Sequence, residues 1–132
     1  MKILVIDDNP AFRYSLAGAL GKGGYQVLTA DDGEHGIALF RTENPDLVIC
    51  DLIMPRLNGV DTIQKIRRES PAMKIIAISG NAVMMNVDGL ATALESGADD
   101  VIVKPFDSQD LLTRVAQVLY GGTPEAQLST SP

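Results

Sequence analysis

Asp51 is the residue whose position most clearly indicates chemistry. It ends the apolar run 47–50 and precedes a loop that contains Pro55 and Gly59. An open α/β sheet has its functional residues at the C-terminal tips of its strands, so a carboxylate placed there is a candidate for catalysis or binding. A carboxylate can take up a phosphoryl group if its surroundings neutralise the added charge. We therefore treat Asp51 as a candidate phosphoacceptor.

Four other polar residues also end apolar runs. Asp7 and Asp8 end the first run, Ser79 the fourth and Lys104 the fifth. Clustered carboxylates repel one another unless a cation relieves them. One lysine among three acids leaves a net negative charge, which suits a hard, oxygen-binding ion such as Mg²⁺. With that ion present, Lys104 and Ser79 would stabilise a phosphate carried by Asp51.

Each of these residues also has a simpler interpretation. The segment 7–10 could be a turn followed by a helix N-cap, Ser79 a loop hydroxyl and Lys104 a surface charge. Because each residue stands at the same end of a different strand, their coincidence favours one shared site.

The hydrophobic pattern predicts a fold that would bring these strand ends together. Amphipathic stretches of helical length alternate with short β-branched runs at 3–6, 26–29, 47–50, 74–78 and 101–103. Strands that are apolar nearly throughout are typical of a sheet covered on both faces. We predict an α/β fold, a doubly wound (βα)5 unit with a five-stranded parallel sheet. Right-handed crossovers would place the strand tips on one edge.

Local signals mark the element boundaries. Gly23 and Gly97 are predicted to end helices, and Asp107 to cap the last one. The segment Arg67-Arg68-Glu69 indicates an exposed helix end. We expect one domain over residues 1–120 and a flexible tail over 121–132, where apolar content is too low for packing.

Charge and cysteine content narrow the function classes. The 132 residues include 11 Lys and Arg against 17 Asp and Glu, a net charge of −6. This acidity gives little support to direct nucleic-acid binding or to an anionic membrane surface. Cys50, the only cysteine, excludes an internal disulfide and a thiolate metal cluster. No apolar stretch is long enough for a membrane span, so we expect no membrane insertion and a cytoplasmic location.

Several motifs together resemble a known family. They are Ile3-Leu4-Val5-Ile6-Asp7-Asp8-Asn9, Asp51-Leu52-Ile53-Met54-Pro55 with Gly59, Ser79-Gly80, Gly97-Ala98-Asp99-Asp100 and Lys104-Pro105-Phe106. In these residues the chain resembles the CheY-like receiver domain of two-component response regulators, over about residues 2–120. The resemblance implies a flavodoxin-like fold with strand order 2-1-3-4-5.

The resemblance also implies roles for the acids. Asp51 would accept a phosphoryl group from the phosphohistidine of a histidine kinase or a histidine phosphotransfer protein. Asp8 and Asp51 would bind Mg²⁺ directly and Asp7 through water, and the backbone carbonyl of Ile53 would complete the protein's ligands.

Lys104 and Ser79 would contact phosphoryl oxygens, and the Lys104-Pro105 peptide would be cis. Phosphorylation would shift the face formed by the fourth helix, fifth strand and fifth helix, which would bind a downstream protein or output domain. The chain would then be a phosphoprotein of a phosphorelay, with at most self-phosphorylation and self-dephosphorylation activity.

Two departures from the family pattern leave alternatives open. Val101 stands where many receivers carry Tyr or Phe, so either it is an ordinary strand residue or an aromatic part of the switch is missing. The stretch between Ser79 and Lys104 is longer than usual, with Met84 and Met85 in the surplus. These methionines either cover the sheet edge or form an adaptable partner surface.

Two other functions compete with the phosphorylation switch. One is a pseudo-receiver, a binding module that never takes phosphate, and the retained site residues weigh against it. The other is a metal-dependent phosphatase with an aspartyl nucleophile. Phosphatases that resemble the haloacid dehalogenase group have a second Asp two positions after the first, where this chain has Ile53.

Overall fold

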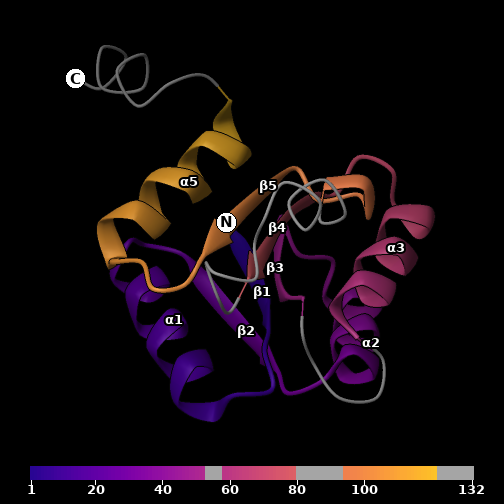
Figure 1. The fold of residues 1–132 in the computed structure, drawn as a ribbon, viewed down its shortest axis with the longest axis horizontal. Helices are drawn as coiled ribbons and strands as arrows, with labels where there is room; N and C mark the ends of the chain where they lie inside the picture. The colour runs from indigo at the N-terminus through magenta and orange to yellow at the C-terminus, as the bar shows by residue number, and fades with distance from the viewer. Residues whose placement is uncertain (53–57, 80–93, 122–132) are drawn as a thin grey trace.

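A computed structural model describes residues 1–52, 58–79 and 94–121. Its strands form one five-stranded parallel sheet in the order β2-β1-β3-β4-β5 (Figure 1). The strands are β1 (Lys2–Ile6), β2 (Gln26–Ala30), β3 (Leu47–Asp51), β4 (Lys74–Ser79) and β5 (Asp100–Val103). The predicted fold class and strand order are confirmed, and each strand extends one residue beyond its predicted apolar run.

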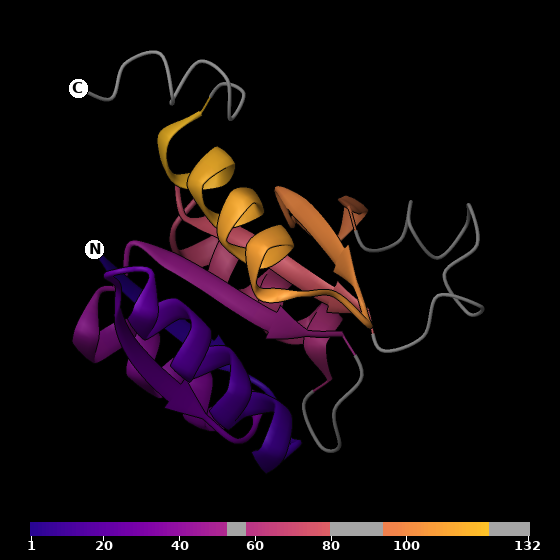
Figure 2. The same cartoon turned by 90° about the vertical axis from the view of Figure 1, so that its left-hand side faces the viewer.

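Four helices of the described chain cover the sheet. They are α1 (Pro10–Lys22), α2 (Gly33–Glu43), α3 (Gly59–Glu69) and α5 (Ser108–Tyr120). In Figure 1, α1 and α5 lie on one face of the sheet and α2 and α3 on the other. The view in Figure 2 shows α1 and α5 in front of the sheet.

The core lies in two clusters, one on each face. Because successive strand residues point to opposite faces, β1 sends Ile3 and Val5 to one cluster and Leu4 and Ile6 to the other. The first cluster includes residues of α1 and α5, namely Leu16, Leu20, Leu111 and Val115. The second includes residues of α2 and α3, namely Ile37, Phe40, Ile63 and Ile66. The strands are therefore buried from both sides, as their near-continuous apolar sequences predict.

Short polar side chains begin the helices. The side chains of Asn9, Asp32, Asn58 and Asp107 each accept a hydrogen bond from the backbone N–H three residues later. Such caps satisfy one of the free donors in the first turn of a helix. The predicted cap at Asp107 is confirmed, and Gly97 has the positive φ, 115°, that only glycine adopts easily.

Some predictions fall in segments 53–57, 80–93 and 122–132, which lie outside the described residues. These predictions concern the carbonyl of Ile53, the Met84 and Met85 loop and most of the tail. Val101 is described: it is a buried residue of β5 that packs in the same cluster as Ile63. Within the described ranges, no helix is long and apolar enough to cross a membrane.

Candidate functional site

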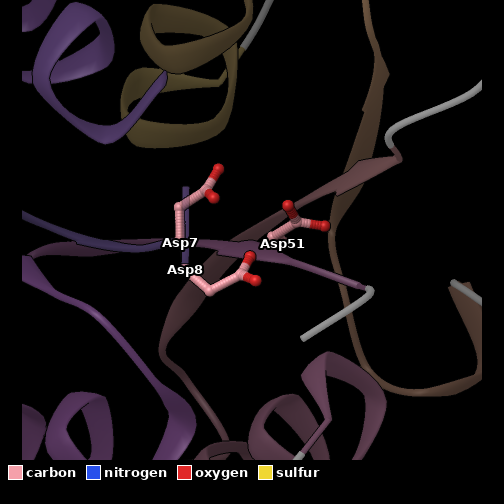
Figure 3. Close-up of side chains that lie close together, drawn as sticks. All are labelled: Asp7, Asp8 and Asp51. Carbon is pink, nitrogen blue, oxygen red and sulfur yellow. The ribbon is translucent and has the colours of Figure 1, made fainter. Parts of the chain in front are cut away.

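Three acids meet where β1 and β3 end. The two strands are neighbours, with Ile6 paired in register with Cys50, so the residues that follow each strand come together. Asp7, Asp8 and Asp51 each contribute one carboxylate oxygen to a group whose members lie within 4.8 Å of one another. Figure 3 shows the three side chains beside one another at these strand ends. Asp7 and Asp51 are buried, whereas Asp8 is exposed.

The carboxylate of Asp7 is only partly satisfied. The backbone N–H of Asn9 donates to its Oδ1 at 2.9 Å, and Arg13 donates to its backbone carbonyl at 2.8 Å. Its Oδ2 is buried and has no hydrogen-bond partner within the described part of the chain. Burial raises the pKa of Asp7, and the negative charges of Asp51 and Asp8 add to that rise. An incoming cation would relieve this unfavourable charge.

Lys104 supplies a positive charge from the end of β5. Its Nζ lies 3.3 Å from Asp51 Oδ2 and 3.6 Å from Asp7 Oδ2. Its backbone N–H donates to the carbonyl of Ser79 at 2.8 Å, which joins the ends of β4 and β5. The Lys104-Pro105 peptide is cis, as the family resemblance implies.

Ser79 ends β4, between the strands that carry Asp51 and Lys104. Asp51 pairs in register with Ile78, and Ser79 pairs with Val103. Ser79 is buried, with 6% of its surface exposed. The sheet therefore brings all five predicted side chains, Asp7, Asp8, Asp51, Ser79 and Lys104, to one edge. The sixth candidate, the backbone carbonyl of Ile53, lies outside the described residues.

Gly59 is needed for α3 to begin next to Asp51. A Cβ atom on Gly59 would overlap the carbonyl oxygen of Asp51 and press on the backbone of Leu52. The N–H of Gly59 donates to the carbonyl of Leu52 at 3.1 Å. Only a residue without a side chain allows this close approach.

The residues present fit a Mg²⁺ ion. The candidate ligands are carboxylate oxygens, which Mg²⁺ prefers, and one of them, Asp7 Oδ2, is a buried acceptor without a donor. Two acids, Asp7 and Asp51, are paired with one lysine, and Asp8 is exposed enough for a hydrated ion to approach.

Sequence reasoning missed one member of the site. The ring of Phe12, in the first turn of α1, lies over Lys104, with Nζ 3.8 Å from the ring centroid. The spacing of Phe12 in the sequence fits the apolar face of a helix, which by itself indicates only a core position. Its place four positions after Asp8, in the first turn of the helix that follows the acids, is the signal that could have indicated proximity to them.

Cys50 is a free cysteine whose side chain is fully buried in β3. Burial, together with the charges of Asp51 and Asp7, raises the pKa of its thiol well above the usual range. The thiol therefore stays protonated at neutral pH and is a poor nucleophile.

Comparison with known proteins agrees with this geometry. The response regulator receiver domain family matches residues 3–116. The probable transcriptional regulator ycf27 of Porphyridium aerugineum is 43% identical in an alignment of 120 residues that covers 89% of this chain and 48% of that protein. The chain thus spans about half the length of this relative. Protein PilH of Pseudomonas aeruginosa is 36% identical over 120 residues, covering 91% of this chain and 98% of PilH.

Solved structures show the same architecture. The chemotaxis protein CheY4 of Vibrio cholerae superposes with a TM-score of 0.83 at 28% identity, covering 89% of this chain and 98% of CheY4. NtrX of Brucella abortus superposes with a TM-score of 0.84 at 29% identity, covering 97% of this chain and 29% of NtrX. The strand order, the strand-end acids and these matches together establish that the chain belongs to the response regulator receiver domain family of two-component systems.

Proposed function

We propose that this chain is a phosphorylation-dependent switch of a phosphorelay, in which Asp51 accepts a phosphoryl group with Mg²⁺ bound beside it. The observation that carries the proposal is the placement of the Asp51 carboxylate. It belongs to a group of three acids that a metal could bridge, and its Oδ2 lies 3.3 Å from the Lys104 ammonium. Two kinds of cation can therefore approach the same carboxylate.

The three acids would bind the metal in different ways. Asp8 and Asp51 would bind Mg²⁺ directly, Asp7 through water, and the backbone carbonyl of Ile53 would be a further ligand. Bound Mg²⁺ supplies positive charge that stabilises the phosphoryl oxygens during transfer. The Oδ2 of Asp7 supports this assignment: it is buried, it accepts no hydrogen bond from the described residues, and it lies 3.6 Å from the Lys104 ammonium, so a second cation nearby would stabilise it further.

The transfer itself needs little from the protein beyond positioning and charge. An oxygen of Asp51 would attack the phosphorus of a phosphohistidine, and the phosphorus–nitrogen bond would break as the phosphorus–oxygen bond forms. The imidazole nitrogen keeps the electron pair and takes a proton from water. Lys104 would pair with one phosphoryl oxygen, and the Ser79 hydroxyl would donate a hydrogen bond to another.

The partners follow from the family. Receiver domains interact with histidine kinases and with output partners, and we propose a histidine kinase or histidine phosphotransfer protein as the donor. Output would pass through the face formed by the fourth helix, β5 and α5, to a downstream protein or an attached domain. Because the chain matches 48% of a ycf27 relative named a probable transcriptional regulator, an attached output domain is compatible with the proposal. Residues 1–120 would act as the receiver, with 121–132 as a flexible tail.

The test is incubation with acetyl phosphate and Mg²⁺, followed by intact mass measurement. We expect one phosphate-sized increment that requires the metal and is lost in Asp51→Asn. Asp61→Asn, which changes an exposed acid of α3, should keep the increment. Absence of any increment would favour a pseudo-receiver, and sustained turnover of many phosphoesters would favour a phosphatase.

A further inference from the structure

The Lys104 ammonium has an aromatic partner in addition to its two carboxylates. Nζ lies 3.8 Å from the centroid of the Phe12 ring, 3.3 Å from Asp51 Oδ2 and 3.6 Å from Asp7 Oδ2. A cation within about 6 Å of a ring centroid, over the ring face, is attracted by the negative potential of that face. Phe12 is therefore a third electrostatic partner of this lysine.

The Phe12 ring is held in place from two directions. The N–H of Phe12 donates to the Asn9 side chain at 3.0 Å, which fixes the first turn of α1. The Phe106 ring meets it edge-on, with centroids 5.6 Å apart and planes at 83°. Asn9 also donates its own N–H to Asp7 Oδ1, so one short segment positions both the ring and the acid. The ring is preorganised to receive an ammonium group.

Metal binding would weaken the attraction of the two carboxylates for Lys104 but not the attraction of the Phe12 ring. Under the proposed function, Mg²⁺ near Asp7 and Asp51 neutralises part of their negative charge, which weakens their attraction for Lys104. The positive ion also repels the Lys104 ammonium directly. The hydrocarbon ring of Phe12 offers no oxygen ligand to Mg²⁺. Its attraction for Lys104 is therefore unaffected by metal binding at the acids.

We infer that Phe12 is a positioning residue: a cation–π contact with its ring keeps the Lys104 ammonium in the site while the carboxylates bind a metal ion. This inference rests on the proposed function, because Lys104 needs to stay beside Asp51 only if a phosphoryl group is to arrive there. Without the ring, Lys104 leaves the site more often when Mg²⁺ is bound, and phosphoryl transfer slows.

The competing explanation is that Phe12 only fills space. Phe12 packs against the core cluster that contains Leu16 and Leu111, so an apolar role would by itself account for a ring at this position. A substitution that keeps the shape of the ring but reduces the negative potential of its face distinguishes the two explanations. Fluorination of phenylalanine does this in steps, because each fluorine withdraws electron density from the ring face.

The first measurement does not depend on phosphorylation. Because Lys104 Nζ lies over the ring, we expect the adjacent ε-methylene protons to resonate upfield in an NMR spectrum, with and without Mg²⁺. Phe12→Trp should keep this shift, and Phe12→Leu should lose it. Phe40→Leu, in the core cluster on the other face, should leave it unchanged while reporting the general cost of removing a ring.

The second measurement is the rate of phosphorylation by acetyl phosphate with Mg²⁺. We expect a decrease of about threefold to tenfold in Phe12→Leu, a graded decrease across mono-, di- and trifluorophenylalanine placed at position 12 alone, and a wild-type rate in Phe12→Trp. Urea unfolding of each variant confirms that it is folded under the assay conditions.

Two results would overturn the inference. One is a Lys104 resonance that leaves the upfield region when Mg²⁺ is added to the wild-type protein. The other is a phosphorylation rate that is constant across the fluorinated series. If the wild-type protein takes no phosphate, the proposed function fails, and the NMR comparison with Mg²⁺ alone still decides whether Phe12 retains Lys104.

Discussion

Gly59 begins α3 directly against the carbonyl group of Asp51, so the start of that helix and the end of β3 share one tightly packed position. Gly59→Ala would force the two backbones apart, because the new Cβ would overlap the carbonyl oxygen. We expect a loss of about 1–3 kcal/mol in the free energy of unfolding. Urea titration followed by circular dichroism measures this loss. A slower phosphorylation of Asp51 should accompany it.

Gly18→Ala is the matched control for this substitution. Gly18 also lies in a helix, but a Cβ atom there would meet no atom within 4 Å. Because alanine favours the helix more than glycine does, this variant should be more stable by about 0.5–1 kcal/mol. Equal effects at the two glycines would contradict the packing argument.

Asp7→Asn should stabilise the protein in the absence of Mg²⁺. The pKa of Asp7 is raised, chiefly by burial, so the folded chain binds this proton more tightly than the unfolded chain does. Stability then falls as pH rises from the ordinary pKa of 3.8 through the raised one, and ionised Asp7 is unfavourable at neutral pH. The advantage of Asp7→Asn should therefore be present at pH 7 and shrink as pH falls toward 4.

Urea midpoints of both proteins over this pH range provide the measurement. Asp61→Asn serves as the control: Asp61 is an exposed acid in the first turn of α3, where a negative charge is favourable, so its loss should not stabilise. An advantage of Asp7→Asn that grows as pH falls would have the wrong sign and would refute the burial argument.

Mg²⁺ should stabilise the folded wild-type protein. A ligand that binds only the folded state adds about 2.7 kcal/mol at a concentration 100 times its Kd. Asp8→Asn and Asp51→Asn should lose most of this gain, because each removes a carboxylate of the three-acid group. Urea midpoints measured with Mg²⁺ and with a chelator test the prediction. An equal gain in all three proteins would mean that the ion binds elsewhere.

Arg67 joins α3 to the starts of β4 and β5, at the sheet edge opposite the acids. Its guanidinium donates to the carbonyls of Gly97, Pro71 and Met73 and to the carboxylate of Asp99. Arg67→Leu would remove the Arg67 hydrogen bonds to all of these acceptors, although the backbone N–H of Ile75 would still donate to Asp99, and should cost about 2 kcal/mol or more. Arg67→Lys should recover little of it, because an ammonium group cannot reproduce the planar fork.

Arg68 provides the comparison for Arg67. It is the next residue of α3 and is exposed, so Arg68→Ala should change the free energy of unfolding by no more than about 0.5 kcal/mol. Both variants should still be phosphorylated when folded, since neither residue lies at the edge that carries Asp51. Loss of phosphorylation in folded Arg67→Leu would show that this edge influences the site.

The strands and most of the site could be predicted because both depend on local patterns. Apolar runs identify the strands, and the topology then places the polar residues after them on one edge. The exposed end predicted for α3 is confirmed for Arg68 and Glu69 but is wrong for Arg67, whose side chain is partly buried. Its acceptors come from segments distant in the chain, and no helical periodicity reveals such partners.

The contact between Phe12 and Lys104 was missed for a related reason. A hydrophobic pattern does not distinguish an aromatic ring from other apolar side chains. It predicts that the ring is buried, but it does not predict that a charged group lies over the ring face. The close approach of Gly59 to Asp51 was equally hidden, because a glycine in a loop motif has many possible explanations. Phe12 and Lys104 stand far apart in the chain, and Gly59 and Asp51 stand close together in it, yet both relationships depend on three-dimensional packing.

The central place of β3 in the sheet has a consequence for hydrogen exchange. This strand is paired on both sides, with β1 and β4, and all five of its residues are buried. Its amides should therefore exchange with solvent only when the whole domain unfolds, and should be among the slowest of the chain. A partner protein that binds at Asp51 therefore contacts a carboxylate whose backbone hydrogen bonds remain intact as long as the domain is folded.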